Sequence, residues 1–220
     1  GAPQGRASGI ARMVRIDVER LSSLIESFYA AAYGRESWRN SMISLAAAFD
    51  ASRAYILRAE TDEDSNVQRY LTPLLSIDDP EFGSPKAVEA FAADPLYSEL
   101  VRMLARAQPG TLIDLAEHLD LGRLPAFDVW QEWFKPRDML QHLRGVLNVS
   151  AAGTHLSVGI DRGVHQDAFD AQDRKLYSLI APHLVRAGEI SDLVRDQAQG
   201  MAFDVLPVAV VVVDRIGRIR

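Results

Sequence analysis

The longest hydrophobic pattern in the chain lies between Phe169 and Phe203 and has the spacing of an α-helix. Asp170 is a suitable N-cap, and Asp173 places a negative charge near the positive end of the helix dipole. Apolar residues then recur every three or four positions as one stripe: Leu176, Leu179, Ile180, Leu184, Ala187, Ile190, Leu193 and Val194. A continuous helix to Phe203 would span about 50 Å at 1.5 Å per residue. That length predicts a connector that leaves one module and enters another.

Shorter helical patterns with clear start signals precede it. Ser37 is a favoured N-cap, and Asp94 followed by Pro95 combines an acidic cap with proline at the first helical position. The predicted helices run from Asp17 to near Gly34, from Ser37 to Phe49, over Lys86–Ala92, from Asp94 to Pro109, and from Pro125 to a break at Pro136.

Alternating segments rich in β-branched residues lie between these helices. The predicted strands are Arg53–Glu60, Arg69–Ser76, Leu140–Val149 and Thr154–Asp161. Pro73 places the second strand on an edge or at a bulge, because proline cannot donate to a ladder. The last two strands are separated by Ser150–Gly153 and form a predicted antiparallel hairpin. Thr111–His118 fits a strand or a helix equally well. Helices at both ends around non-local strands predict an α+β sensor-type fold.

Composition narrows the classes of function. The 220 residues carry a formal net charge of −6 and a pI near 5.4. Protein surfaces that bind nucleic acid are usually basic, so the charge argues against direct nucleic-acid binding by this chain. The absence of cysteine excludes disulfides, thiol nucleophiles and cysteine metal sites. Val205–Val213 is too short to span a bilayer and no secretory segment opens the chain, so we expect a cytoplasmic protein with no membrane partner. Gly1–Arg12 is interpreted as a disordered tail or a vector-derived remnant.

Several short motifs occur together in a familiar order: Ser37-Trp38, Asp94-Pro95, Ala107–Gly110, Phe127–Pro136, Thr154–Arg162, Phe169–Asp173 and Ala181–Ala187. Their order resembles the N-terminal sensory region of LuxR-type bacterial transcription regulators. In that group a GAF-like domain is followed by a PAS-like segment and a C-terminal helix-turn-helix. The most specific match is Pro182-His183-Leu184 with Arg186-Ala187, inside the long helix. Leu206–Ile219 resembles the opening strand and turn of the PAS-like part.

The resemblance implies an α+β, GAF-like antiparallel sheet flanked by helices, with a long C-terminal connector helix. It also implies an organisation along the chain. Residues 1–16 are a tail, residues 17–168 a GAF-like sensor domain, residues 169–205 a connector and dimerisation helix, and residues 206–220 the start of a truncated PAS-like domain. The DNA-binding helix-turn-helix of the family is expected beyond Arg220, so DNA is a partner of the parent protein only.

Aromatic residues are the candidates for a ligand site. Trp130, Trp133 and Phe134 fall within five positions, which exceeds what one small core face requires. Some of them are predicted to line a cavity or interface, although core packing explains them equally well. Tyr55, Tyr70, Phe91 and Tyr97 could join them around a small apolar or aromatic ligand.

A metal or catalytic site has little support in the sequence. None of the five histidines, His118, His142, His155, His165 and His183, has the i, i+4 spacing of a helical zinc site. Ser157 lies in Leu-Ser-Val-Gly, which lacks the first glycine of a nucleophile elbow. Asp78 and Asp79 precede proline in a loop, where turn capping is the ordinary role. We predict no metal site, no catalytic residue and no enzyme activity, and the sequence leaves open whether a cofactor is bound.

The long helix is the predicted site of homodimerisation and signalling. The residues assigned to this role are Leu176, Ile180, Pro182, His183, Leu184, Ala187, Ile190 and Val194. Pro182 predicts a kink or break, because it lacks an N–H and its ring opposes the Ser178 carbonyl. His183 either makes a hydrogen bond across that kink or packs on the sheet, or else responds to pH through its charge. The alternatives to a ligand sensor are a ligand-free interaction and dimerisation module and, ranked last, an enzyme of signalling-nucleotide metabolism.

Overall fold

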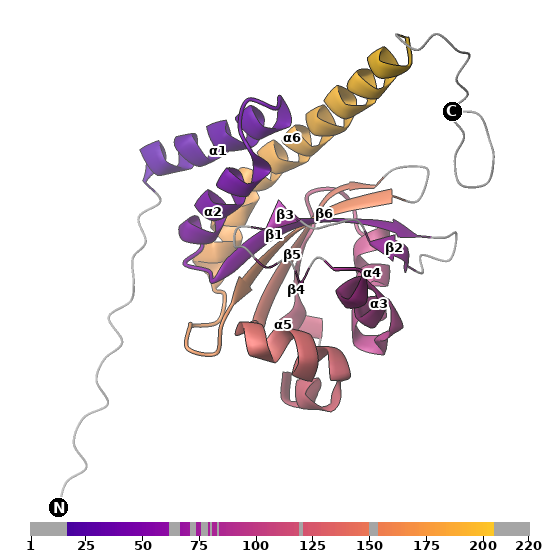
Figure 1. The fold of residues 1–220 in the computed structure, drawn as a ribbon. Coiled ribbons are helices and arrows are strands. Elements are labelled where there is room, and N and C mark those ends of the chain that lie inside the picture. The colour runs from indigo at the N-terminus through magenta and orange to yellow at the C-terminus, as the bar shows by residue number, and fades with distance from the viewer. Residues whose placement is uncertain are drawn as a thin grey trace, which may run out of the picture.

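The computed structural model describes residues 17–61, 67–70, 74–75, 79, 81–82, 84–118, 121–149 and 154–204. These residues form an α+β fold in which one antiparallel sheet separates two groups of helices. Helices α1 (Val18–Ala32), α2 (Trp38–Ala48) and α6 (Ala171–Asp204) lie on one side of the sheet in Figure 1. Helices α3 (Pro85–Ala93), α4 (Pro95–Arg106) and α5 (Leu115–His118) lie on the other side. The predicted fold class is confirmed.

The sheet has the order β2-β1-β6-β5-β4, and β3 also pairs with β1. Its strands in the described ranges are β1 (Arg53–Thr61), β2 (Val67–Tyr70), β3 (Leu74–Leu75), β4 (Leu112–Asp114), β5 (Gln141–Val149) and β6 (Thr154–Arg162). The longest ladders join β6 to β1 and to β5, with Tyr55 opposite Gly159 and Arg144 opposite Gly159. The predicted β5–β6 hairpin is therefore present, and β6 lies at the centre of the sheet.

The predicted helix starts are also present. Asp17, Ser37, Ser84 and Asp94 each accept a backbone N–H at the beginning of α1, α2, α3 and α4. At α6 the cap is reciprocal. The Asp170 carboxylate accepts from the backbone of Gln172 and Asp173, and the Asp173 carboxylate accepts from the backbone of Asp170. This arrangement is a capping box with an acidic residue at each position.

Two segments differ from the sequence prediction. The predicted helix Pro125–Lys135 is instead a 3₁₀ turn (Leu121–Ala126), a π-helical turn (Trp130–Phe134) and a second 3₁₀ turn (Lys135–Arg137). Three large aromatic side chains must all enter one core here, and the wider π turn accommodates them. The predicted strand Arg69–Ser76 is represented by β2 and β3, both on the β1 edge, and Pro73 lies outside the described residues. Thr111–His118 contains both alternatives, strand β4 and then helix α5.

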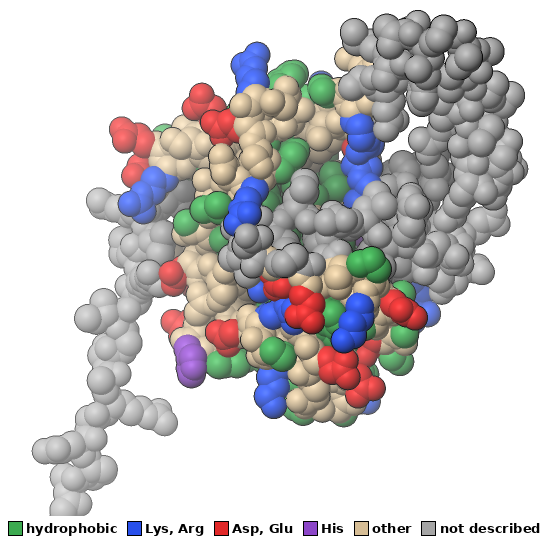
Figure 2. Space-filling view, viewed as in Figure 1, with side chains coloured by type: hydrophobic (Ala, Val, Ile, Leu, Met, Phe, Trp, Pro, Cys, Tyr) green, Lys and Arg blue, Asp and Glu red, His purple; other side chains and the backbone are tan. Residues whose placement is uncertain are grey.

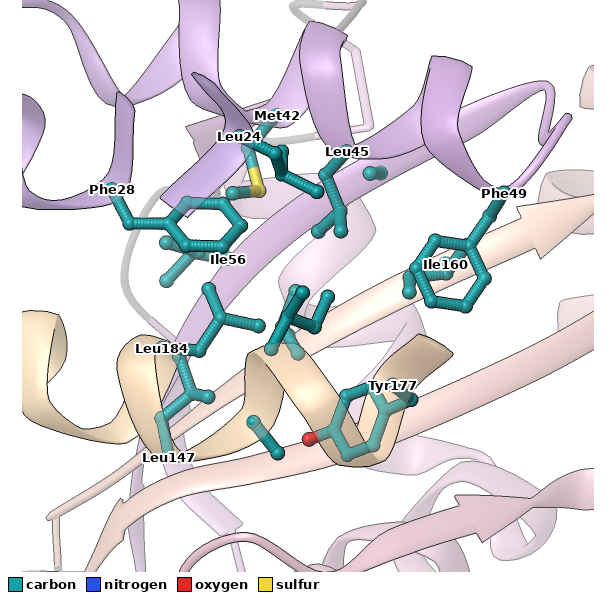
Figure 3. Packing of buried hydrophobic residues seen from close by; sticks show 14 of the residues in the cluster. Leu24, Phe28, Met42, Leu45, Phe49, Ile56, Leu147, Ile160, Tyr177 and Leu184 are labelled. Carbon is teal, nitrogen blue, oxygen red and sulfur yellow. The ribbon is translucent and has the colours of Figure 1, made fainter. Parts of the chain in front are cut away.

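One face of the sheet is apolar and packs against α1, α2 and α6. Ala54, Ile56, Leu143, Leu147, Leu156, Val158 and Ile160 supply the strand side of this core. Figure 3 shows Leu24 and Phe28 of α1, Met42 and Leu45 of α2, and Tyr177 and Leu184 of α6 converging on it. Burying each large apolar side chain contributes about 1.5–3 kcal/mol, so this interface is a large source of stability.

Helix α6 is continuous across Pro182 and is part of this core. Leu176, Ile180, Leu184 and Ala187 of the predicted dimer stripe are buried within the chain, and Ile190 packs against the same cluster. The expectation that the stripe is a free, self-complementary surface is therefore corrected over these positions. The reason is that the sheet already covers them. Only the last part of the stripe projects beyond the sheet, as Figure 1 shows.

We expect Gly145→Ala to lower the free energy of unfolding by about 1–3 kcal/mol through overpacking. A Cβ at position 145 would lie 1.8 Å from the Tyr177 hydroxyl oxygen and 2.6 Å from its Cζ, so α6 must shift. Urea denaturation measures the loss. Gly188→Ala is the matched control on α6, since its Cβ would meet only a Leu156 methyl group at 3.2 Å. An equal loss in both variants would show that close approach of Tyr177 to β5 is not the constraint.

Candidate ligand site

The second face of the sheet differs from the first because it carries a group of buried polar side chains beside buried apolar ones such as Leu57 and Val146. Side chains alternate along a strand, and the apolar core takes Leu156, Val158 and Ile160 of β6. The residues between them therefore face α3, α4 and the π turn. Six polar or charged side chains on this face are buried: Arg53, His142, Arg144, His155, Ser157 and Asp161. We call this surface the polar face.

Asp161 is at the centre of the charges on the polar face. Its Oδ1 atom accepts a hydrogen bond from Arg144 Nη1 at 3.2 Å and lies 3.0 Å from His142 Nδ1. Burial would by itself raise the pKa of Asp161, but the charges of Arg144, His142 and Arg53 lower it below its ordinary value. The carboxylate is therefore ionised at neutral pH. Sequence reasoning missed this group; the available signal was charged residues alternating with apolar ones within two predicted strands.

Arg144 lies flat against the sheet because its neighbour on β6 is glycine. Its guanidinium carbon is 4.6 Å from the centre of the Tyr55 ring. A Cβ at position 159 would lie 1.9 Å from Arg144 Nη1 and 2.5 Å from Tyr55 Cζ. Gly159 therefore allows both side chains to cover the middle of the polar face.

A second ionic group closes one end of the polar face. Asp79 accepts from Arg53 at 3.1 Å and from Arg137 Nε at 2.8 Å, and Arg137 also contacts Glu81 at 2.9 Å. The pKa of Asp79 is lowered: its burial acts in the opposite direction, but hydrogen bonds from Arg137 and the Phe82 backbone outweigh it. The Phe82 ring lies 5.1 Å from the Arg53 guanidinium and 5.8 Å from that of Arg137. Phe82 thus covers this end of the polar face between two cations.

Five of the aromatic residues predicted as ligand contacts form a wall opposite the polar face, and Tyr55 lies on the polar face itself. Tyr55, Phe91, Tyr97, Trp130, Trp133 and Phe134 belong to one buried cluster. Phe91 is its centre, stacked on Tyr97 with ring centroids 4.8 Å apart and edge-on to Trp133 at 5.5 Å. The Asp94 carboxylate, which caps α4, also accepts from the Val129 backbone at 3.4 Å and so joins α4 to the π turn. The seventh candidate, Tyr70, ends β2, and its side chain lies outside the described residues.

Several buried polar atoms between the polar face and the wall lack a hydrogen-bond partner of good geometry. Among the described residues six such atoms occur: Tyr55 Oη, Trp133 Nε1, both ring nitrogens of His155, Asp161 Oδ2 and Tyr177 Oη. Five of these atoms lie in the polar face or the wall, and only Tyr177 Oη lies in the apolar core. Five of the six atoms therefore lie on the same side of the sheet. An unpaired buried polar group costs about 1–3 kcal/mol.

His183 was the histidine that the sequence singled out, and it has a structural partner. Its Nδ1 lies 3.1 Å from the Tyr29 hydroxyl, and the two rings meet edge-to-face at a centroid distance of 5.9 Å. Tyr29 belongs to α1, so this contact joins α6 to α1. Neither predicted alternative named this partner, because sequence periodicity does not show which helix faces which.

Beyond His183, α6 makes polar contacts with strands β1 and β5 and then extends past the sheet. Asp192 forms an ion pair with Arg58 of β1 and accepts from Asn148 of β5 at 3.1 Å. The next two residues are exposed, Leu193 by 59% and Val194 by 36%. Of the predicted signalling residues, Val194 is therefore the apolar one that remains accessible, while Pro182 is exposed next to the half-buried His183.

A hollow at the start of α6 is a weaker candidate for a ligand site. It is lined by residues 48–50, Arg162 and the first turn of α6. Arg162 donates to the carbonyl oxygens of Phe49, Asp167 and Ala168 and to the Asp173 carboxylate. Its guanidinium is occupied by the chain itself, so it fixes the loop before α6.

Other classes of site find no support in the ranges that the structure covers. Those residues include no group of three or more potential metal ligands, and none of their helices is long and apolar enough to cross a membrane. In the view of Figure 2, acidic and basic side chains are interspersed over the described surface. That face offers no continuous basic patch of the kind that grips a phosphate backbone.

Comparison with known proteins identifies a structural neighbour. No family model matches the chain, and a search of curated proteins found no match. Among solved structures the chain is similar to the VqsR LBD domain from Pseudomonas aeruginosa, with a TM-score of 0.53 and 13% identity. The similarity covers 80% of this chain and 96% of that chain. VqsR is a LuxR-type regulator. At this identity the likeness concerns the fold.

We expect the buried His155 side chain to make the free energy of unfolding depend on pH. Burial lowers the pKa of His155 to about 4, against about 6.5 when unfolded. Its neutral form contributes stability above pH 6.5, and this is lost as the pH falls towards 4, at up to about 1.4 kcal/mol per pH unit. We expect His155→Gln to flatten that slope in urea denaturation between pH 6.5 and 4.5. Tyr177→Phe should retain the wild-type slope, because burial raises the pKa of Tyr177 further above this range. Equal slopes in all three proteins would contradict the assignment.

Proposed function

We propose that this chain is the ligand-sensing region of a LuxR-type transcription regulator, and that a small organic molecule binds between the polar face and the aromatic wall. DNA binding would be performed by a helix-turn-helix domain outside this chain. The fold similarity to a regulator's ligand-binding domain supports the class of protein. The unpaired atoms Tyr55 Oη, Trp133 Nε1 and Asp161 Oδ2 carry the proposal of a ligand.

These atoms favour a ligand over packing alone. A core that serves only stability is better filled with apolar groups, because each unpaired polar atom costs free energy that packing does not return. The apolar face of the same sheet is filled in this way: among the described residues, Tyr177 Oη is its one unpaired buried side-chain atom. A ligand-free interaction module would not require the contrast between the two faces.

The proposed output is a homodimer whose geometry depends on the ligand. A ligand can change the output only by binding two arrangements of the protein unequally. Helix α6 packs on the opposite face of the sheet from the proposed ligand and continues beyond it. We assign the dimer contact to the projecting end around Leu193 and Val194, because the earlier part of the stripe is buried.

Protein produced in its own host is expected to carry a small-molecule adduct in native mass spectrometry that disappears on denaturation. Tyr55→Phe should reduce its occupancy roughly tenfold, since one hydrogen bond contributes about 1 kcal/mol or slightly more. Tyr177→Phe is the matched control: it removes an unpaired buried hydroxyl from the opposite face and should leave occupancy unchanged. Host-grown protein without any adduct, together with no thermal shift in an organic extract of the host, would refute ligand sensing.

The dimer is tested by analytical ultracentrifugation of the wild type and of the double variant Leu193→Asp/Val194→Asp. We expect a wild-type dimer and a predominantly monomeric variant, because two charges would replace the accessible apolar pair on α6. Val164→Asp is the control, since Val164 is 53% exposed in the turn after β6, away from this end of α6. A monomeric wild type at high concentration would remove the dimer from the proposal.

A further inference from the structure

The β5–β6 hairpin contains a β-bulge that decides which side of the sheet Asn148 faces. We infer that this bulge is a conformational switch: in a second register the end of β5 moves by one residue, and Asn148 leaves α6 and bonds to His155. The inference rests on the proposed ligand-sensing function for its trigger, since the ligand would select between the two registers. The registers themselves do not depend on a ligand.

Leu147 is the extra residue of the bulge. The ladder pairs Val146 with Ser157 and Asn148 with Leu156, and the register shifts between them. Two consecutive residues of β5 therefore lie opposite Leu156. Leu147 packs in the apolar core and Asn148 donates to α6, so both side chains face the same side of the sheet. In a regular strand they would face opposite sides.

Asn148 belongs to a polar group around Asp192, just before α6 extends past the sheet. Asp192 Oδ2 accepts from Asn148 Nδ2 at 3.1 Å. Asp192 Oδ1 pairs with Arg58 of β1 and lies 3.0 Å from Arg195 Nη2. The Asp192 and Arg58 side chains are only 21% and 19% exposed, so water replaces these bonds less readily than on an open surface. The bulge thus contributes one of the contacts that hold α6 at this point.

A regular ladder would instead pair Leu147 with Leu156 and Asn148 with His155. Leu147 would remain on the side of the apolar core, whereas Asn148 would turn to the polar face. His155 is 1% exposed there, and neither of its ring nitrogens has a hydrogen-bond partner in the described part of the chain. Directly opposed residues have Cβ atoms about 4.5–5.5 Å apart. An amide and an imidazole can each donate and accept, so they can bond at that separation.

The two registers exchange one hydrogen bond for another. The observed register pairs Asn148 with the Asp192 carboxylate and leaves His155 unpaired, and the second register does the reverse. Residues before the bulge keep their partners, so the Arg144–Asp161 pair is preserved. Val146 directly precedes the bulge and is fully buried in the cluster of the aromatic wall. A ligand that packs against Val146 would therefore act on the bulge.

An engineered cysteine pair can trap the second register, because the chain has no cysteine of its own. The reporter is Val149→Cys/Thr154→Cys: these positions are partners in the second register and one position out of register in the observed one. Cβ atoms one position out of register point to opposite faces, which prevents a disulfide. We expect oxidised glutathione to close the reporter slowly and Glu60→Cys/Thr154→Cys, partners in both registers, quickly. A control that closes while the reporter stays reduced would overturn the switch.

Further substitutions in the reporter protein separate a register shift from general fraying. Asp192→Ala removes the acceptor that holds Asn148 and should raise the closing rate about tenfold, as expected for a lost charge-assisted hydrogen bond. Arg58→Met detaches Asp192 from β1 but keeps that acceptor, and should leave the rate unchanged. Adding His155→Phe to Asp192→Ala should lower the rate again. Equal rates in the Asp192→Ala and Arg58→Met proteins, or no effect of His155→Phe, would contradict the second register.

Hydrogen–deuterium exchange shows whether the register affects α6. Closing the reporter pair removes the Asn148 bond to Asp192 and should speed amide exchange of residues 193–204 about tenfold. Closing the control pair should leave that exchange unchanged. Equal exchange in the two oxidised proteins would disconnect the bulge from α6 and overturn the switch.

Chemical-exchange saturation transfer NMR measures the same equilibrium without cysteines. In ¹⁵N-labelled Asp192→Ala we expect a minor state at the backbone amides of Asn148 and Val149 but not at Arg144, whose partner is the same in both registers. Adding His155→Phe should remove it. An Asp192→Ala protein without a minor state would overturn the switch. None of these measurements needs a ligand, so ligand sensing itself is decided separately by the adduct in host-grown protein.

Discussion

The buried carboxylate of Asp161 is the constraint on which the polar face depends. Desolvating a carboxylate costs several kcal/mol unless a cation and hydrogen bonds compensate it. Arg144 and His142 of β5 provide that compensation, and they reach Asp161 only in the observed register of β5 and β6. A one-residue slip would turn both to the opposite face. Gly159 is required as well, because a side chain there would occupy the position of Arg144 Nη1.

The two faces of the sheet thus differ in the polarity of their buried side chains. The face under α1, α2 and α6 forms an apolar core, and its buried charges Asp114 and Arg162 are paired with residues of α6. The polar face carries six buried polar side chains and incurs the cost of several unpaired atoms. The apolar core offsets that cost. Figure 1 shows that the same sheet supports both layers.

Much of the fold could be predicted from the sequence, because its signals are local. The caps Asp17, Ser37 and Asp94 and the β5–β6 hairpin follow from residue type and spacing alone. The aromatic candidates also converge, with Tyr70 outside the described side chains. The ionic centre lies within the predicted β5–β6 hairpin, but it could not be predicted because residue type and spacing do not give the register that brings Arg144 and His142 to Asp161. Periodicity identified the apolar stripe of α6 but not the surface that covers it. A helix that packs on the sheet of its own chain therefore had the same sequence pattern as a helix that forms a dimer contact.

Strand β5 is where the two faces come closest. Arg144 points into the polar face and contacts Tyr55, while the adjacent Gly145 lies beneath the Tyr177 ring of α6. A guest that changes the Arg144–Asp161 pair acts one residue from the point where α6 rests on the sheet. Glycine makes that contact sensitive, since backbone and ring touch without an intervening side chain. Farther along, Asn148 of β5 and Arg58 of β1 hold Asp192 just before α6 leaves the sheet. Under the proposed function, a ligand that shifts β5 would therefore act on α6 at two points and move its projecting end around Leu193.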